Sequence, residues 1–176
     1  MNQFQRRKSI RHATHDYTQP GFYFFTICTY EKEKIFGEIF EKAMRHSVAG
    51  NIVLKCWEQL PSFFESILLD AFTVMPNHIH GIVQLKEGNR NALGQIVRNF
   101  KSICTRKIRK YTQIEAIWQD NYFERVIRSE RELNLIRLYI DLNPLMWDEN
   151  KKMYQLEFRS EEELEELLKS YRESNL

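Results

Sequence analysis

The sequence predicts a single α+β domain, and three observations carry that prediction. The chain has 176 residues, which is the length of one domain. It is 43% hydrophobic and 28% charged, so it can build a core and is neither disordered nor fibrous. Short runs of aromatic and β-branched residues alternate with longer amphipathic patterns, as expected when strands and helices share one fold.

Four strands are expected from the composition of short segments. Gly21 to Tyr30 is rich in aromatic and β-branched residues and predicts the first strand. Ile67 to Met75 and His78 to Leu85 have the same character, and the Pro76-Asn77 turn between them predicts a hairpin. Phe123 to Ile127 predicts the fourth strand.

Two helices are expected between these strands. The first lies between Phe40 and Phe63 and ends near Pro61, although Gly50 interrupts it. The second covers residues 93–108, because its apolar side chains repeat at i, i+3, i+4 and i+7 and must face a core. The opposite side of this second helix carries a polar stripe: Arg98, Lys101, Thr105 and Arg109.

Two further helices are expected after the fourth strand. Ser129 and Glu132 form an S-x-x-E capping box at a helix start. Pro144 disfavours helical geometry in the residue before it, so this helix should end at about Leu142 or Asn143. The tail, residues 157–176, places leucines among glutamates and predicts an amphipathic helix.

The order of these elements is β-α-β-β-α-β-α-α. The first six match the ferredoxin-like, split βαβ arrangement, with an antiparallel sheet of four to five strands and helices on one face. Residues 1–150 are expected to form one domain with a basic N-terminal arm over residues 1–20, and residues 151–176 an acidic tail. A fold by itself implies no chemistry, so function has to come from a site.

The net charge of +2 hides an uneven distribution. Residues 90–110 carry seven basic side chains and no acid, whereas residues 157–176 carry seven glutamates against three basic residues. The N-terminal arm holds four basic residues: Arg6, Arg7, Lys8 and Arg11. Such density indicates a polyanion partner, because each Lys or Arg that meets a phosphate releases a counterion. Solvated helix faces are the other interpretation.

Two classes of protein are not favoured. No apolar run reaches the roughly 18 to 20 residues of a membrane helix, and the first residues lack a signal-peptide core. The three cysteines, Cys28, Cys56 and Cys104, are widely spaced and form no CxxC pair, which speaks against a disulfide framework or a zinc knuckle. We therefore expect a cytoplasmic protein without a membrane partner.

Two pairs of residues are candidates for chemistry. His78 and His80 alternate with Ile79 in a strand, so both imidazoles lie on one face and form half of a metal site, unless they are only exposed polar partners. Tyr139 and Asn143 are one helical turn apart. Tyrosine can attack phosphorus and an asparagine oxygen suits Mg²⁺ or Mn²⁺. A core tyrosine and an ordinary helix terminus are the alternatives.

Residues 75–83 (MPNHIHGIV) resemble the His-hydrophobic-His (HUH) motif of single-tyrosine transposases, in particular the REP-associated tyrosine transposases. Further segments resemble the same family in the expected order: residues 16–17, 19–21, 23–29, 36–39, 96–102, 117–124, 127–128 and 139–145. The sequence departs from many relatives in having Phe123 and Arg125 where they have tyrosine and histidine. Neither departure affects a catalytic position.

The resemblance implies a role for each of the four residues. His78 and His80 would bind a divalent cation, Mg²⁺ or Mn²⁺, with Asn143 as third ligand, and Tyr139 would be the nucleophile. Tyr122 is the competing nucleophile, disfavoured because no ligand-type residue lies one turn away. The basic residues of the arm, with Arg98, Lys101 and Arg109, would hold the DNA backbone. Such a protein would associate with the nucleoid.

The implied activity is cleavage and rejoining of single-stranded DNA that carries stem-loops, through a 5′-phosphotyrosine. A catalytically silent DNA- or RNA-binding module and a metal nuclease that uses water are the alternatives. A monomer and a homodimer both remain open, and that choice decides whether Tyr139 serves its own metal site or that of a partner. The acidic tail would be a solvated packing helix, a dimer element or a screen against nucleic acid.

Overall fold

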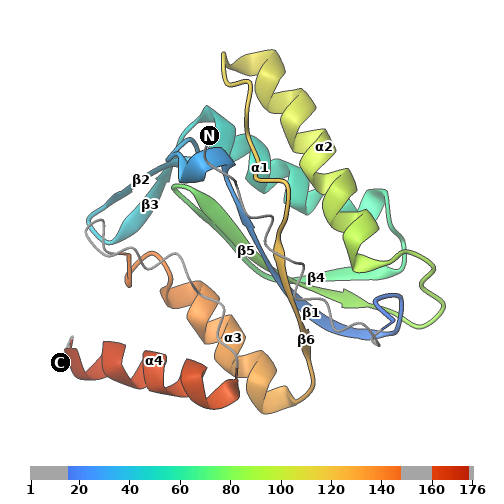
Figure 1. Ribbon diagram of the computed structural model, residues 1–176, viewed down its shortest axis with the longest axis vertical. Coiled ribbons are helices and arrows are strands. Elements are labelled where there is room, and N and C mark those ends of the chain that lie inside the picture. Colours follow the sequence, from blue (N-terminus) through green and yellow to red (C-terminus); the bar gives the residue numbers. More distant parts are fainter. Residues whose placement is uncertain (1–15, 148–159, 175–176) are drawn as a thin grey trace, which may run out of the picture.

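The computed structural model describes residues 16–147 and 160–174 and contains six strands and four α-helices in this part of the chain (Figure 1). In chain order they are β1 (Gly21–Cys28), β2 (Gly37–Phe40), β3 (Ala43–His46), α1 (Val48–Glu58), β4 (Ile67–Met75), β5 (His78–Leu85), α2 (Leu93–Tyr111), β6 (Phe123–Ile127), α3 (Glu130–Leu142) and α4 (Glu161–Ser174). None of these helices is long and apolar enough to cross a membrane.

Four of the strands form one antiparallel sheet in the order β4-β5-β1-β6. The central pair is β1 and β5, which are far apart in the sequence. Helices α1 and α2 lie on one side of the sheet, and α3 and α4 lie on the other (Figure 1). The predicted ferredoxin-like arrangement is confirmed, with the helix that follows β6 added on the face that the split βαβ unit leaves open.

Both faces of the sheet are covered, so the central strands bury side chains of both alternating sets. Side chains alternate along β1, so Tyr23 and Phe25 enter the cluster beneath α1 and α2, whereas Phe24 enters the cluster beneath α3. Leu164 and Leu168 of α4 belong to this second cluster. The acidic tail helix thus packs on the domain, and its glutamates Glu161 and Glu165 pair with Arg131 of α3.

The sequence predicts no strand over residues 37–46. These residues form the hairpin β2–β3, whereas helix α1 lies within its predicted range and begins at Val48. The turn between the strands places Glu41 and Lys42 at φ values of 49° and 62°, a conformation that glycine or asparagine usually signals. The sequence has neither residue there, so the hairpin leaves no turn signal.

The sequence suggests that Gly50 interrupts helix α1. In the structure Gly50 instead lies in the first turn of the helix. The Ser47 hydroxyl caps the helix by accepting a hydrogen bond from the Gly50 N–H at 3.1 Å. A side chain at position 50 would place its Cβ 2.2 Å from the carbonyl oxygen of Phe36. Glycine is therefore required by the close approach of this backbone segment.

The buried carboxylate of Glu132 joins α3 to β6. It accepts a hydrogen bond from Arg125 Nε at 2.6 Å and another from the backbone N–H of Arg128 at 2.8 Å. The predicted cap is also present, since the Ser129 hydroxyl accepts from the Glu132 N–H at 2.9 Å.

Replacing Glu132 with alanine should lower the free energy of unfolding by about 3 kcal/mol, because it removes the counter-ion of a largely buried guanidinium. Urea unfolding at pH 7 measures the change. The matched control is Glu165→Ala, which breaks an exposed pair on the same side of the sheet and should cost about 0.5 kcal/mol or less. An equal loss in the two variants would contradict this account of Glu132.

Candidate active site

The structure brings together the four residues that the sequence proposed as two separate pairs. His78 and His80 lie at the start of β5, and their Nε2 atoms are 3.1 Å apart. Tyr139 projects from α3 with its hydroxyl 3.1 Å from His80 Nε2 of the same chain. Asn143, at the C-terminus of α3, hydrogen-bonds to both His78 and Tyr139. All four side chains are buried, with at most 5% exposure.

Two residues that sequence reasoning missed set the orientation of the imidazoles. Asn77 Oδ1 lies 2.8 Å from His78 Nδ1, and Thr26 Oγ1 lies 2.8 Å from His80 Nδ1. The amide oxygen of Asn77 only accepts, so His78 Nδ1 carries the proton and its Nε2 presents a lone pair. Asn77 had been noted only as a turn residue. Thr26 faces His80 through the β1–β5 register, which the sequence does not reveal.

Burial keeps both histidines neutral. Desolvation lowers the pKa of His78 to about 4 and the pKa of His80 well below its ordinary value. Burial raises the pKa of Tyr139, while the hydrogen bond to Asn143 acts in the opposite direction by favouring the phenolate. The site therefore holds two neutral imidazoles and a protonated phenol at neutral pH.

These atoms fit a divalent cation. Neutral imidazole is the metal-binding form of histidine. Two adjacent ligands of an octahedral ion, each at about 2.1 Å, lie roughly 3.0 Å apart, and the two Nε2 atoms are separated by 3.1 Å. In the described part of the chain no group of three or more His, Cys, Asp or Glu residues could hold a metal. The Asn143 amide, which hydrogen-bonds to His78, offers an oxygen of the type that suits a hard cation.

The lone pair of His80 Nε2 has two potential uses. It can accept the hydrogen bond from the Tyr139 hydroxyl or bind a cation, but it cannot do both at once.

Trp147 lies beside the same cluster, with its ring stacked on His78 at a centroid distance of 6.1 Å and an interplanar angle of 27°.

The metal-free protein should lose stability on acidification from pH 6.5 towards pH 4. Below pH 6.5 the unfolded chain takes up protons on both histidines, while the folded chain does not until a lower pH. The free energy of unfolding should fall by about 1.4 kcal/mol per pH unit for each histidine. Urea titrations in EDTA measure this slope, and His80→Gln should reduce it by one histidine's share. A flat profile between pH 6.5 and pH 5 would refute the neutral pair.

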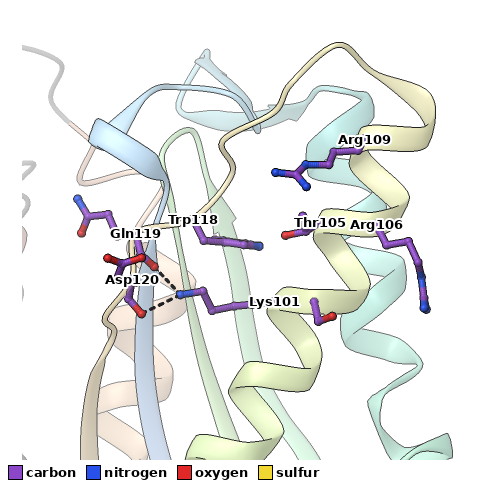
Figure 2. Close-up of a pocket in the computed structure, with 8 residues that line it drawn as sticks. Lys101, Thr105, Arg106, Arg109, Trp118, Gln119 and Asp120 are labelled. Atoms are coloured by element: carbon purple, nitrogen blue, oxygen red, sulfur yellow. Dashed lines mark hydrogen bonds between the residues drawn. The ribbon is translucent and has the colours of Figure 1, made fainter.

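The basic helix α2 borders a second feature, an open groove of about 590 Å³ against the segment that precedes β6 (Figure 2). Lys101 reaches across it and donates to the backbone carbonyls of Gln119 and Asp120. Burial lowers the pKa of the Lys101 ammonium. Figure 2 shows Arg109 pointing towards the groove and Arg106 pointing away from it.

The predicted DNA-binding residues are therefore in different situations. Arg98 is exposed on α2. Arg109 is half-exposed and donates to the carbonyl of Glu115 at 2.6 Å. Lys101 holds backbone carbonyls, so part of its hydrogen-bonding capacity is used within the protein. The four basic residues of the N-terminal arm lie outside the described residues: Arg6, Arg7, Lys8 and Arg11.

The groove and the histidine site lie at the same end of the sheet. Cys28 at the end of β1 pairs with His78, and its carbonyl accepts a hydrogen bond from the Gln119 N–H at 3.0 Å. Tyr122, the competing nucleophile, packs against the cluster beneath α1 and α2 and bonds to Glu124. It is thus on the opposite face of the sheet from Tyr139.

Residues 22–143 match the family described as transposase IS200-like. An uncharacterized protein from Haemophilus influenzae is 38% identical over 165 residues, covering 82% of this chain and 92% of the relative. A second protein of that organism, provisionally named a REP-associated tyrosine transposase, is 28% identical over 139 residues. The match covers 74% of this chain and 73% of the relative.

Two solved structures share the fold. A REP-associated tyrosine transposase bound to a REP hairpin has a TM-score of 0.60 and 20% identity, over 77% of this chain and 73% of that one. A protein from Deinococcus radiodurans, provisionally named a transposase, has a TM-score of 0.50 and 14% identity, over 72% of this chain and 93% of that one. The resemblance seen in the sequence is confirmed. The chain belongs to the IS200-like transposase family, and within it is similar to the REP-associated tyrosine transposases.

Proposed function

We propose that this transposase cleaves and rejoins single-stranded DNA through a covalent bond between Tyr139 and a 5′ phosphate. The observation that supports the proposal most strongly is the convergence of the Tyr139 hydroxyl and two imidazole nitrogens within 3.1 Å. A tyrosine held only for packing needs neither neutral histidines nor an amide one turn away. The arrangement unites a nucleophile with the donor set of a hard cation.

The chemistry conserves the energy of the broken bond. Tyr139 Oη loses its proton and attacks the scissile phosphorus, the bond from phosphorus to the 3′ oxygen breaks, and that oxygen takes up a proton. The Asn143 amide favours the phenolate form of Tyr139. Mg²⁺ or Mn²⁺ held by His78, His80 and Asn143 would supply charge stabilisation at the phosphate. The freed 3′-hydroxyl of another strand reverses the reaction, so no nucleotide cofactor is needed.

A stem-loop DNA is the proposed substrate. A solved relative with the same fold is bound to a REP hairpin. The guanidinium groups of Arg98 and Arg109 are solvent-exposed on α2, and the groove beside α2 is linked to the histidine site through Cys28 of β1. Basic side chains here would contact backbone phosphates without reading sequence. The basic N-terminal arm would add to this contact.

The decisive experiment compares the two ends of a cut strand. A hairpin-bearing oligonucleotide, labelled at either its 5′ or its 3′ end, is incubated with the protein and Mg²⁺ or Mn²⁺ and run on a denaturing gel. We expect only the 3′-labelled fragment to remain on the protein, because Tyr139 retains the 5′ phosphate. Two free ends would indicate a nuclease that uses water, and binding without any cut would indicate a silent DNA-binding module.

A further inference from the structure

A strained segment lies directly beside His78. Between β1 and β2, the backbone of Glu31 has φ 48° and that of Lys32 has φ 60°. These values are in the left-handed region, which residues other than glycine seldom adopt. Strain of this kind persists only where the surroundings impose it, and it is concentrated at functional sites. The Glu41–Lys42 turn has similar φ values, so what distinguishes the Glu31–Lys32 segment is its contact with the histidine site.

The same buried amide holds this segment and the imidazole of His78. Asn77 Nδ2 donates to the carbonyl of Lys32 at 3.2 Å, while Asn77 Oδ1 accepts from His78 Nδ1 at 2.8 Å. The Thr29 hydroxyl lies 2.8 Å from the carbonyl of Glu33 and 2.9 Å from that of Asn77. The position of the segment is thus coupled to the orientation of one histidine of the site.

The alternating charges of residues 31–34 are sorted into two groups. Glu31 hydrogen-bonds to the Tyr30 hydroxyl, and Glu31 and Glu33 both raise the pKa of Tyr30 by their charge. Lys32 lies close enough to His78 for its charge to act on that ring. Lys34 Nζ is 5.9 Å from the ring centre of Trp147, which stacks on His78. The carboxylates gather at Tyr30 and the ammonium groups gather at the histidine site.

We propose that Lys32 and Lys34 form a seat for a DNA backbone phosphate next to the scissile one. This inference rests on the proposed function and adds a binding subsite to it. Both lysines are exposed, so a phosphate can reach them from solvent. The seat would hold the strand so that the next phosphate lies at Tyr139.

The test measures binding, so that it does not depend on cleavage. In a Tyr139→Phe background, hairpin oligonucleotides carry a single uncharged methylphosphonate at each phosphate around the cleavage position in turn. One position should weaken binding about tenfold, as expected for loss of a charge-assisted hydrogen bond. The Lys32→Gln Lys34→Gln variant should bind unmodified DNA about tenfold more weakly and show no further loss at that one position.

Controls separate the seat from charge in general and from folding. Lys86→Gln removes an exposed lysine at the opposite end of β5 from His78 and should retain the methylphosphonate effect. Lys32→Gly, which suits the left-handed backbone, should weaken binding as Lys32→Gln does. The salt dependence of binding should fall by about 0.7 in log–log slope when both lysines are removed, because the seat neutralises one phosphate of a single strand. If the double variant still lost the full tenfold in binding at that methylphosphonate position, the seat would be overturned. If the protein with Tyr139 intact formed no covalent adduct, only the proposed role of Tyr139 would be overturned.

Discussion

Replacing Tyr139 with phenylalanine should abolish the covalent protein–DNA adduct and lower strand cleavage by about 1,000-fold or more. The change removes the hydroxyl that attacks phosphorus and leaves the ring, which packs edge-on against Phe24. The fold should therefore be retained. Denaturing gels with labelled hairpin DNA measure the adduct, and equilibrium binding of the same DNA should be unchanged.

Tyr122→Phe is the matched control for this experiment. It removes a hydroxyl from the other face of the sheet, where Tyr122 bonds to Glu124. Adduct formation should remain within about twofold of the unmodified protein, since no reacting group is lost. An adduct that survives in the Tyr139 variant and disappears in the Tyr122 variant would assign the nucleophile to Tyr122.

Tyr139→Phe should also bind Mn²⁺ at least as tightly as the unmodified protein. The phenolic hydroxyl lies 3.1 Å from His80 Nε2, and a cation would bind that same nitrogen. Calorimetry can show whether removing the competing donor changes the affinity. Weaker Mn²⁺ binding in this variant would mean that the hydroxyl supports the cation instead of competing with it.

Replacing His78 and His80 together with glutamine should weaken Mn²⁺ binding by about 100-fold or more and remove metal-dependent cleavage. Losing an outer partner of a ligand already costs 10- to 100-fold, and this change removes two direct ligands. The His46→Gln variant is the control, because His46 is also partly buried with a lowered pKa but lies in β3. Equal losses in both variants would show that histidine burial in general, and not this pair, determines metal binding.

Folding of the double variant has to be checked in the same experiment. The two imidazoles are buried, and each bonds through Nδ1 to a neighbour, Asn77 or Thr26. Losing these bonds should lower the midpoint of thermal unfolding without changing the circular dichroism spectrum of the folded state. Retained DNA binding together with lost Mn²⁺ binding would identify a local defect at the site. Loss of both would be traced to unfolding by the same spectra.

Most of the architecture follows from local patterns in the chain. The apolar period of residues 93–108, the capping pair Ser129 and Glu132, and the turn at Pro76-Asn77 each correspond to an element in the structure. The β2–β3 hairpin did not follow, because its turn uses left-handed Glu41 and Lys42 without glycine. A turn of this kind leaves no signal in the residue types.

Local periodicity in the chain is enough to show which side chains share a face. A period of two places His78 with His80, and a period of 3.6 places Tyr139 with Asn143. The sequence also shows that basic and acidic residues occupy separate segments. These are properties of neighbours along the chain, and they hold for any tertiary arrangement of the helices and strands.

How these faces meet depends on long-range packing. Strand register sets Thr26 against His80, and packing of α3 on the sheet carries Tyr139 to the same imidazole across 59 positions of sequence. Other long-range contacts join the Lys101 ammonium to the carbonyl of Gln119 and the carbonyl of Lys32 to the Asn77 amide. Contacts of this kind depend on the packing of whole elements, so no local period or motif encodes them.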